Sequence, residues 1–139
     1  ITPNRSEFRA VVGKWGNERE FTASARRLRS KLRVDALLVT RSEEGMTLFT
    51  QKTRLHAAAQ AREVFDVSGA GDTVIATLAV AMAAGEPLQA AVNLANRAAG
   101  IVVGKFGTAV ALPDELFAGQ PAIPGKQESD SRKKPRKAR

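Results

Sequence analysis

One stretch of the sequence narrows the choice of fold before any motif is considered: residues 71–84 are apolar on nearly every side. A helix without a polar face has to be covered all round, because apolar side chains left in water cost free energy. Gly85 and Pro87 follow directly and are typical of a helix end. We therefore expect a buried helix over residues 71–84.

Helix-like and strand-like segments alternate along the rest of the chain. Apolar residues at helical spacing predict three more helices, at residues 5–12, 22–32 and 88–103. Short apolar or extended runs predict strands at residues 35–40, 46–50, 53–57 and 63–67. The first of these is a short apolar run, which is typical of a strand buried on both faces. The alternation predicts an α/β fold with a largely parallel sheet.

Composition excludes several classes of function. The chain has 139 residues, of which 43% are hydrophobic and 26% charged, and this is enough for one folded domain. It has no cysteine and one histidine, His56, so disulfides, thiol catalysis and a histidine-rich metal site are excluded. No apolar stretch approaches the roughly 18 residues of a membrane span, and no signal peptide is recognisable. We expect a cytoplasmic protein without a membrane partner, and the start at Ile1 suggests a piece of a longer chain.

The net charge of +8 is concentrated at the C-terminus. Residues 125–139 contain seven Lys or Arg against two Asp or Glu, while the other 124 residues contain 15 against 12. We expect a folded portion over residues 1–119 and a disordered basic tail over residues 120–139. No aromatic residue interleaves the charges to stack on bases, so a solvated extension is favoured. A non-catalytic module that binds nucleic acid through this tail remains the alternative from another class.

The segment most suggestive of chemistry is DVSGAGDT at residues 66–73, between a predicted strand and the apolar helix. Its two glycines allow backbone N–H groups to converge at a helix start, where the helix dipole favours an anion such as a transferring phosphoryl group. Asp72 is placed to accept a proton from an attacking hydroxyl. A purely structural interpretation, a tight turn with Asp72 complementing the dipole, remains equally open. No Walker A loop or G-x-G-x-x-G occurs.

A second candidate motif is Asn4-Arg5-Ser6-Glu7, at the start of a predicted helix. Asn and Glu three residues apart form a capping box, which satisfies free N–H groups of the first turn. In the functional interpretation, the amide and the carboxylate instead face a site and organise water around Mg2+. Taken alone, the motif favours the capping role.

Together these motifs resemble a known family. Residues 66–73 resemble the C-terminal signature of the ribokinase-like (pfkB) carbohydrate kinases, and Asn4-x-x-Glu7 resembles their N-x-x-E motif. Residues 2–13, 37–46 and 102–105 resemble the heptose 7-phosphate kinase branch. The resemblance covers roughly residues 1–117 and implies the C-terminal part of a ribokinase-like three-layer sandwich, a mostly parallel sheet flanked by helices.

The resemblance also implies an activity. It is the ATP-dependent phosphorylation of D-glycero-β-D-manno-heptose 7-phosphate at O1, giving the 1,7-bisphosphate for ADP-heptose and lipopolysaccharide core synthesis. The implied partners are ATP and the sugar phosphate. A homodimer of the full-length parent is compatible with the resemblance. The family's sugar-binding N-terminal half is absent, so we expect little or no turnover by this chain alone. A kinase of another sugar in the same family is the alternative.

By the same resemblance, specific residues receive roles. Asp72 is the base, and Gly69, Ala70 and Gly71 form the anion hole. The nucleotide-binding set is Asn4, Glu7, Thr40, Ser42, Gly45 and Asn96. Glu7 would hold Mg2+ through water, and Asp66 with Ser68 would lie near a K+ ion. Two positions depart from the general pattern: Ser42 replaces a glycine, which we interpret as a trait of the branch, and Arg97 follows Asn96 where a small residue is usual.

Overall fold

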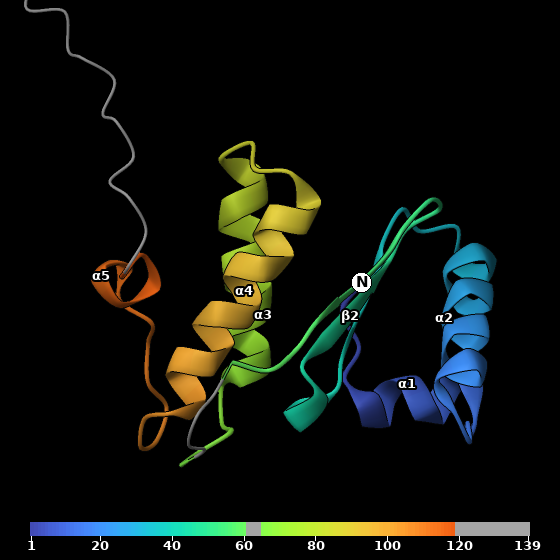
Figure 1. Cartoon of the computed structure of the whole chain (residues 1–139), viewed down its shortest axis with the longest axis horizontal. Helices are drawn as coiled ribbons and strands as arrows, with labels where there is room; N and C mark the ends of the chain where they lie inside the picture. The colour runs from blue at the N-terminus through green and yellow to red at the C-terminus, as the bar shows by residue number, and fades with distance from the viewer. Residues whose placement is uncertain (61–64, 119–139) are drawn as a thin grey trace, which may run out of the picture.

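The computed structural model describes residues 1–60 and 65–118, and the expected basic tail at 120–139 lies outside them. The described residues form three layers (Figure 1). Helices α1 (Arg5–Val12) and α2 (Glu18–Leu32) cover one face of a sheet made of β1 (Leu37–Thr40), β2 (Met46–Phe49) and β3 (Arg54–Ala57). Helices α3 (Ala70–Ala83) and α4 (Leu88–Val103) cover the other face, and the short α5 (Pro113–Leu116) contacts α4. The α/β three-layer architecture is confirmed.

The strands pair differently from the prediction. They lie in the order β1-β2-β3 with antiparallel pairing, where Leu38 faces Leu48 and Thr47 faces His56. The turns at 41–45 and 50–53 are too short for the crossover that parallel neighbours need. Parallel pairing occurs in the described residues only where Ile1–Asn4 runs beside β1, with a 2.9 Å hydrogen bond from Leu38 N to Ile1 O. The prediction of a largely parallel sheet was therefore wrong for this part of the molecule.

All four predicted helices are present in the predicted order, with one clearly shifted start, while the short α5 was not predicted. Helix α1 spans the predicted residues 5–12, and α2 begins four residues before the predicted Thr22. The reason is a cap, since Asn17 Oδ1 accepts a 2.9 Å hydrogen bond from Glu20 N and fixes the helix start at Glu18. Of the strand predicted at 63–67, residues 63–64 lie outside the described residues and 65–67 are not in a strand.

Each face of the sheet has its own core. Leu37, Val39 and Phe49 point toward α1 and α2, where the rings of Phe8, Trp15, Phe21 and Phe49 pack with centroids 5.4–5.6 Å apart. Leu38, Met46 and Leu48 point toward α3 and α4. This alternation follows from the period of two in a strand. It confirms a strand buried on both faces, although β1 covers only residues 37–40 of the predicted 35–40 and Asp35 is exposed.

Helix α3 departs from the expectation of complete burial. Val74, Leu78 and Ala81 are buried, but Ile75 and Met82 remain about half exposed (51% and 52%). Both line an apolar groove of about 610 Å3 between α3 and the sheet face that carries Leu38 and Leu48. No element of the described residues covers that side of α3. Within the same residues no helix is long and apolar enough to cross a membrane.

Candidate active site

The DVSGAGDT segment leads directly into α3. Ser68 N donates a 2.8 Å hydrogen bond to Asp66 Oδ1, and this bond, with weaker contributions from the Ser68 side chain and from Gly107 N–H, lowers the pKa of Asp66. Gly69 caps α3 in the left-handed conformation, with φ of +78°. A Cβ at Gly69 or Gly71 would meet no atom within 4 Å. The turn is therefore open to a ligand and is not blocked by packed side chains.

Asp72 lies in the first turn of α3 and is exposed. The N–H groups of a first helical turn have no partner inside the helix, so those of Gly71 and Asp72 point outward with the positive end of the helix dipole. Among the described residues no ion pair or side-chain hydrogen bond engages the Asp72 carboxylate. Backbone amides that can bind an anion and a carboxylate without a partner among the described residues therefore lie together at one accessible helix end.

The Asn4–Glu7 motif forms the capping box. Glu7 N donates a 2.9 Å hydrogen bond to Asn4 Oδ1, and Asn4 N donates one of 2.8 Å to Glu7 Oε2. The structural role of both side chains is confirmed. Among the described residues no hydrogen bond or ion pair engages Glu7 Oε1, and the Glu7 side chain is exposed. One carboxylate oxygen suits Mg2+, which keeps several waters and takes its other ligands from phosphates.

The turn at residues 41–45, called the 41–45 turn below, joins β1 to β2 through a 3-10 helix at Ser42–Glu44. Ser42 has φ of +54°, a conformation that favours glycine. Gly45 has φ of +89°, and a Cβ there would lie 2.1 Å from Ala57 O. Glycine is therefore required at position 45.

Asn96 is buried on α4 and donates a 2.7 Å hydrogen bond from its amide nitrogen to Ala58 O. Gly45 and Asn96 thus contact the same backbone segment, residues 57–59, from two sides. Thr40 forms a backbone bridge with Asn4. Figure 1 shows the start of α1, the 41–45 turn and the start of α3 at the same end of the molecule. Three segments that carry predicted residues therefore lie at one end of the molecule.

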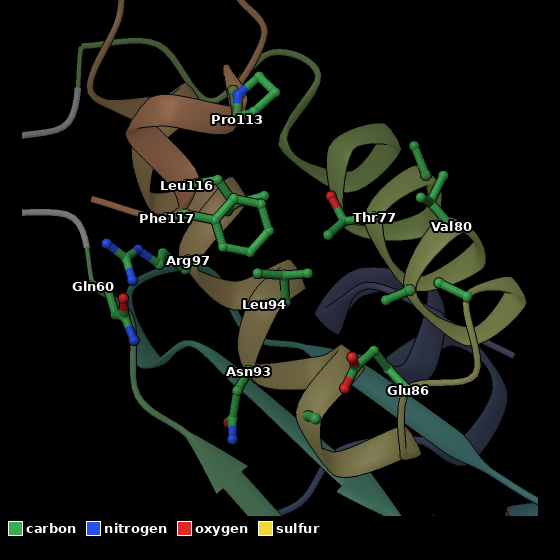
Figure 2. Close-up of a pocket in the computed structure, with 15 residues that line it drawn as sticks. Gln60, Thr77, Val80, Glu86, Asn93, Leu94, Arg97, Pro113, Leu116 and Phe117 are labelled. Carbon is green, nitrogen blue, oxygen red and sulfur yellow. The ribbon is translucent and has the colours of Figure 1, made fainter. Parts of the chain in front are cut away.

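A separate cavity of about 850 Å3 lies between α3, α4 and α5 (Figure 2). In Figure 2, Gln60, Asn93 and Arg97 lie on one side of it and Thr77 and Val80 on the other. None of the predicted site residues lines it. The cavity is therefore distinct from the site at the start of α3.

Sequence reasoning missed one buried charge. Arg41 is 7% exposed and forms a bidentate pair with Glu18, with N–O distances of 2.8 and 2.9 Å. No local signal relates residues 23 positions apart. His56 contacts Thr47 Oγ1 through Nδ1 at 2.9 Å. The described residues contain no cluster of three or more His, Asp or Glu that would hold a metal by itself.

Comparison with known proteins first identifies the class of protein to which the chain belongs. The model of the pfkB family of carbohydrate kinases matches residues 1–115, and the chain belongs to this family. The fold agrees, because the ribokinase of Thermotoga maritima superimposes with a TM-score of 0.74 at 24% identity, over 84% of this chain and 40% of that one. Phosphofructokinase-2 of Escherichia coli in complex with potassium gives 0.76 at 16% identity, over 84% and 38%.

More similar relatives are known by sequence. The chain is 60% identical over 116 residues to the D-beta-D-heptose 7-phosphate kinase of Bordetella bronchiseptica, covering 84% of this chain and 37% of that protein. It is also 60% identical over 117 residues to the bifunctional protein HldE of Pseudomonas aeruginosa, covering 84% of this chain and 25% of that protein. The chain therefore spans only about a third of the first relative's length and a quarter of the second's.

Proposed function

We propose that this chain is the ATP-side portion of a kinase that phosphorylates D-glycero-β-D-manno-heptose 7-phosphate at O1. The product would be the 1,7-bisphosphate used for ADP-heptose and the lipopolysaccharide core. The observation that carries the proposal is the 60% identity to a heptose 7-phosphate kinase over 116 residues. The open DVSGAGDT turn at the start of α3 supports the same chemistry.

In the proposed mechanism, Asp72 accepts the proton of the sugar O1 hydroxyl as that oxygen attacks the γ-phosphorus of ATP. The phosphoryl group passes to O1, and ADP leaves. The first-turn amides around Gly69, Ala70 and Gly71 stabilise the charge on the equatorial oxygens. Because Asp72 is exposed and has no side-chain partner in the described part of the chain, its carboxylate is accessible to an acceptor.

The nucleotide and the ions are assigned to the other predicted residues. Thr40, Ser42, Gly45 and Asn96 would border ATP, and Asn4 with Glu7 would face its phosphates. Mg2+, bound through water to Glu7, would neutralise phosphate charge. Asp66 and Ser68 would lie near a K+ ion, a role supported by the family fold of a phosphofructokinase-2 studied with potassium. A cytoplasmic homodimer of the full-length parent is part of the same proposal.

The test restores the missing length. Residues 1–117 of this chain replace the matching region of the Bordetella kinase, and ADP release is measured with heptose 7-phosphate, ribose and fructose. We expect turnover with the heptose, lowered about 100-fold or more by Asp72→Asn because a general base is lost. Asp114→Asn, an exposed change on α5, is the matched control and should leave the rate unchanged.

Two results would contradict the proposal. Full turnover by the Asp72→Asn chimera would remove the assigned base, and a preference for ribose or fructose would favour the alternative sugar. The isolated 139-residue chain is expected to release little or no ADP, because two thirds of the relative's length is not in it. Rapid turnover by the isolated chain would refute this last expectation.

A further inference from the structure

Five charged side chains form a continuous ionic chain across the sheet end. Arg54 contacts Glu18, Glu18 pairs with Arg41, and Arg41 also contacts Glu44. Arg5 Nη1 completes the chain at 2.6 Å from Glu44 Oε1. The members come from α1, α2, β3 and the 41–45 turn, so the chain joins elements that are distant in sequence.

The Arg41–Glu18 pair is the rigid centre of this chain. The Arg41 side chain is 8% exposed, its guanidinium lies 4.3 Å from the centre of the Phe21 ring, and Thr47 Oγ1 lies 3.4 Å from Nη1. A guanidinium that packs on an aromatic ring and donates two hydrogen bonds to one carboxylate is held in a fixed orientation. The paired charges also hold the pKa of Glu18 below and that of Arg41 above their ordinary values.

The Arg41–Glu18 pair lies where the 41–45 turn begins. Arg41 begins the 41–45 turn, and its N–H donates a 2.7 Å hydrogen bond to Gly45 O, which closes the turn. Glu44 is in the same turn and is tied to Arg5, the residue after Asn4. The ionic chain therefore connects the turn that carries Ser42 and Gly45 with the helix start that carries Asn4.

We propose that Glu18, acting through Arg41, is a positioning residue that holds the 41–45 turn in the shape that binds ATP. This inference rests on the proposed function. Glu18 lies on α2, outside every motif described above, and it acts by fixing the orientation of the Arg41 guanidinium. The nucleotide itself is not expected to touch Glu18.

The experiment titrates ATP with Mg2+ into the 139-residue chain by calorimetry. Glu18→Gln should weaken ATP binding about tenfold, because one charged hydrogen-bond partner of a buried group is lost. Arg41→Lys should weaken it similarly, since an ammonium cannot form the two-point fork. Glu43→Gln is the matched control: Glu43 is exposed in the same turn, has no ion pair among the described residues, and should stay within twofold.

A stability control separates positioning from loss of fold. Ala25→Gly destabilises α2 in its core without touching the ionic chain, so it should lower the melting temperature and leave ATP affinity unchanged. Amide exchange at Gly45, whose N–H bonds Ser42 O at 3.0 Å, should accelerate in Glu18→Gln and not in Ala25→Gly. Wild-type affinity in Glu18→Gln would overturn the inference and leave the proposed function standing. Absence of ATP binding by the wild-type chain would overturn the inference, while the proposed function is decided by turnover of the chimera.

Discussion

The side-chain amide of Asn96 on α4 donates a 2.7 Å hydrogen bond to the carbonyl oxygen of Ala58, just after β3. Asn96 is 4% exposed, so water has little access to its side-chain amide. Asn96→Leu should lower the free energy of unfolding by about 1–3 kcal/mol, because Ala58 O loses its donor. Urea denaturation measures this, with the exposed Asn93→Leu on the same helix as control. Equal losses in both variants would contradict a role for the bond.

Gly13, which follows α1, is a matched control for Gly45 in the 41–45 turn. Both have positive φ, +89° and +84°, but a Cβ would lie 2.1 Å from Ala57 O at Gly45 and meet nothing within 4 Å at Gly13. Gly13→Ala should cost about 1–2 kcal/mol from the backbone conformation alone, because φ of +84° with ψ of −167° is a combination that essentially only glycine adopts. Gly45→Ala should cost clearly more, about 3 kcal/mol, since backbone has to move. Equal urea midpoints for the two variants would show that the close approach is unimportant.

Ser42 carries strain that glycine would relieve. Its φ of +54° is unfavourable for a residue with a Cβ, by roughly 1–2 kcal/mol, while glycine loses about 0.5–1 kcal/mol more backbone entropy on folding. Ser42→Gly should therefore raise the free energy of unfolding by about 0.5–1 kcal/mol. Ser30→Gly, in α2 and exposed, should lower it by a similar amount. A melting experiment in which Ser42→Gly is the less stable protein would refute the strain assignment.

Acid stability should depend on Glu18. Arg41 and Arg54 lower its pKa from the ordinary 4.5, the hydrogen bond with Arg41 contributing most. A lowered folded-state pKa stabilises the protein above the unfolded-state value, and this contribution is lost as pH falls through the folded-state value. The difference in unfolding free energy between wild type and Glu18→Gln should thus be constant above about pH 4.5 and shrink below it. A difference independent of pH down to acid unfolding would contradict this.

Much of this protein follows from local sequence. The helical periods of 5–12 and 88–103 predicted α1 and α4, and the short apolar run at 35–40 predicted a strand buried on both faces. The family motifs lie where expected, at helix starts and in the 41–45 turn, because glycine, asparagine and glutamate at fixed spacings determine caps and turns directly.

Tertiary structure decided the rest, because it depends on contacts between residues far apart in the chain. Sheet direction depended on which strands meet, and the pairing of Arg41 with Glu18 joins positions that no period relates. The exposed side of α3 shows the same limit: its apolar sequence specifies that a cover is needed, while only the fold shows that none of the described elements supplies one. Short-range chemistry fixes elements and caps, whereas packing partners are fixed only when the chain is assembled.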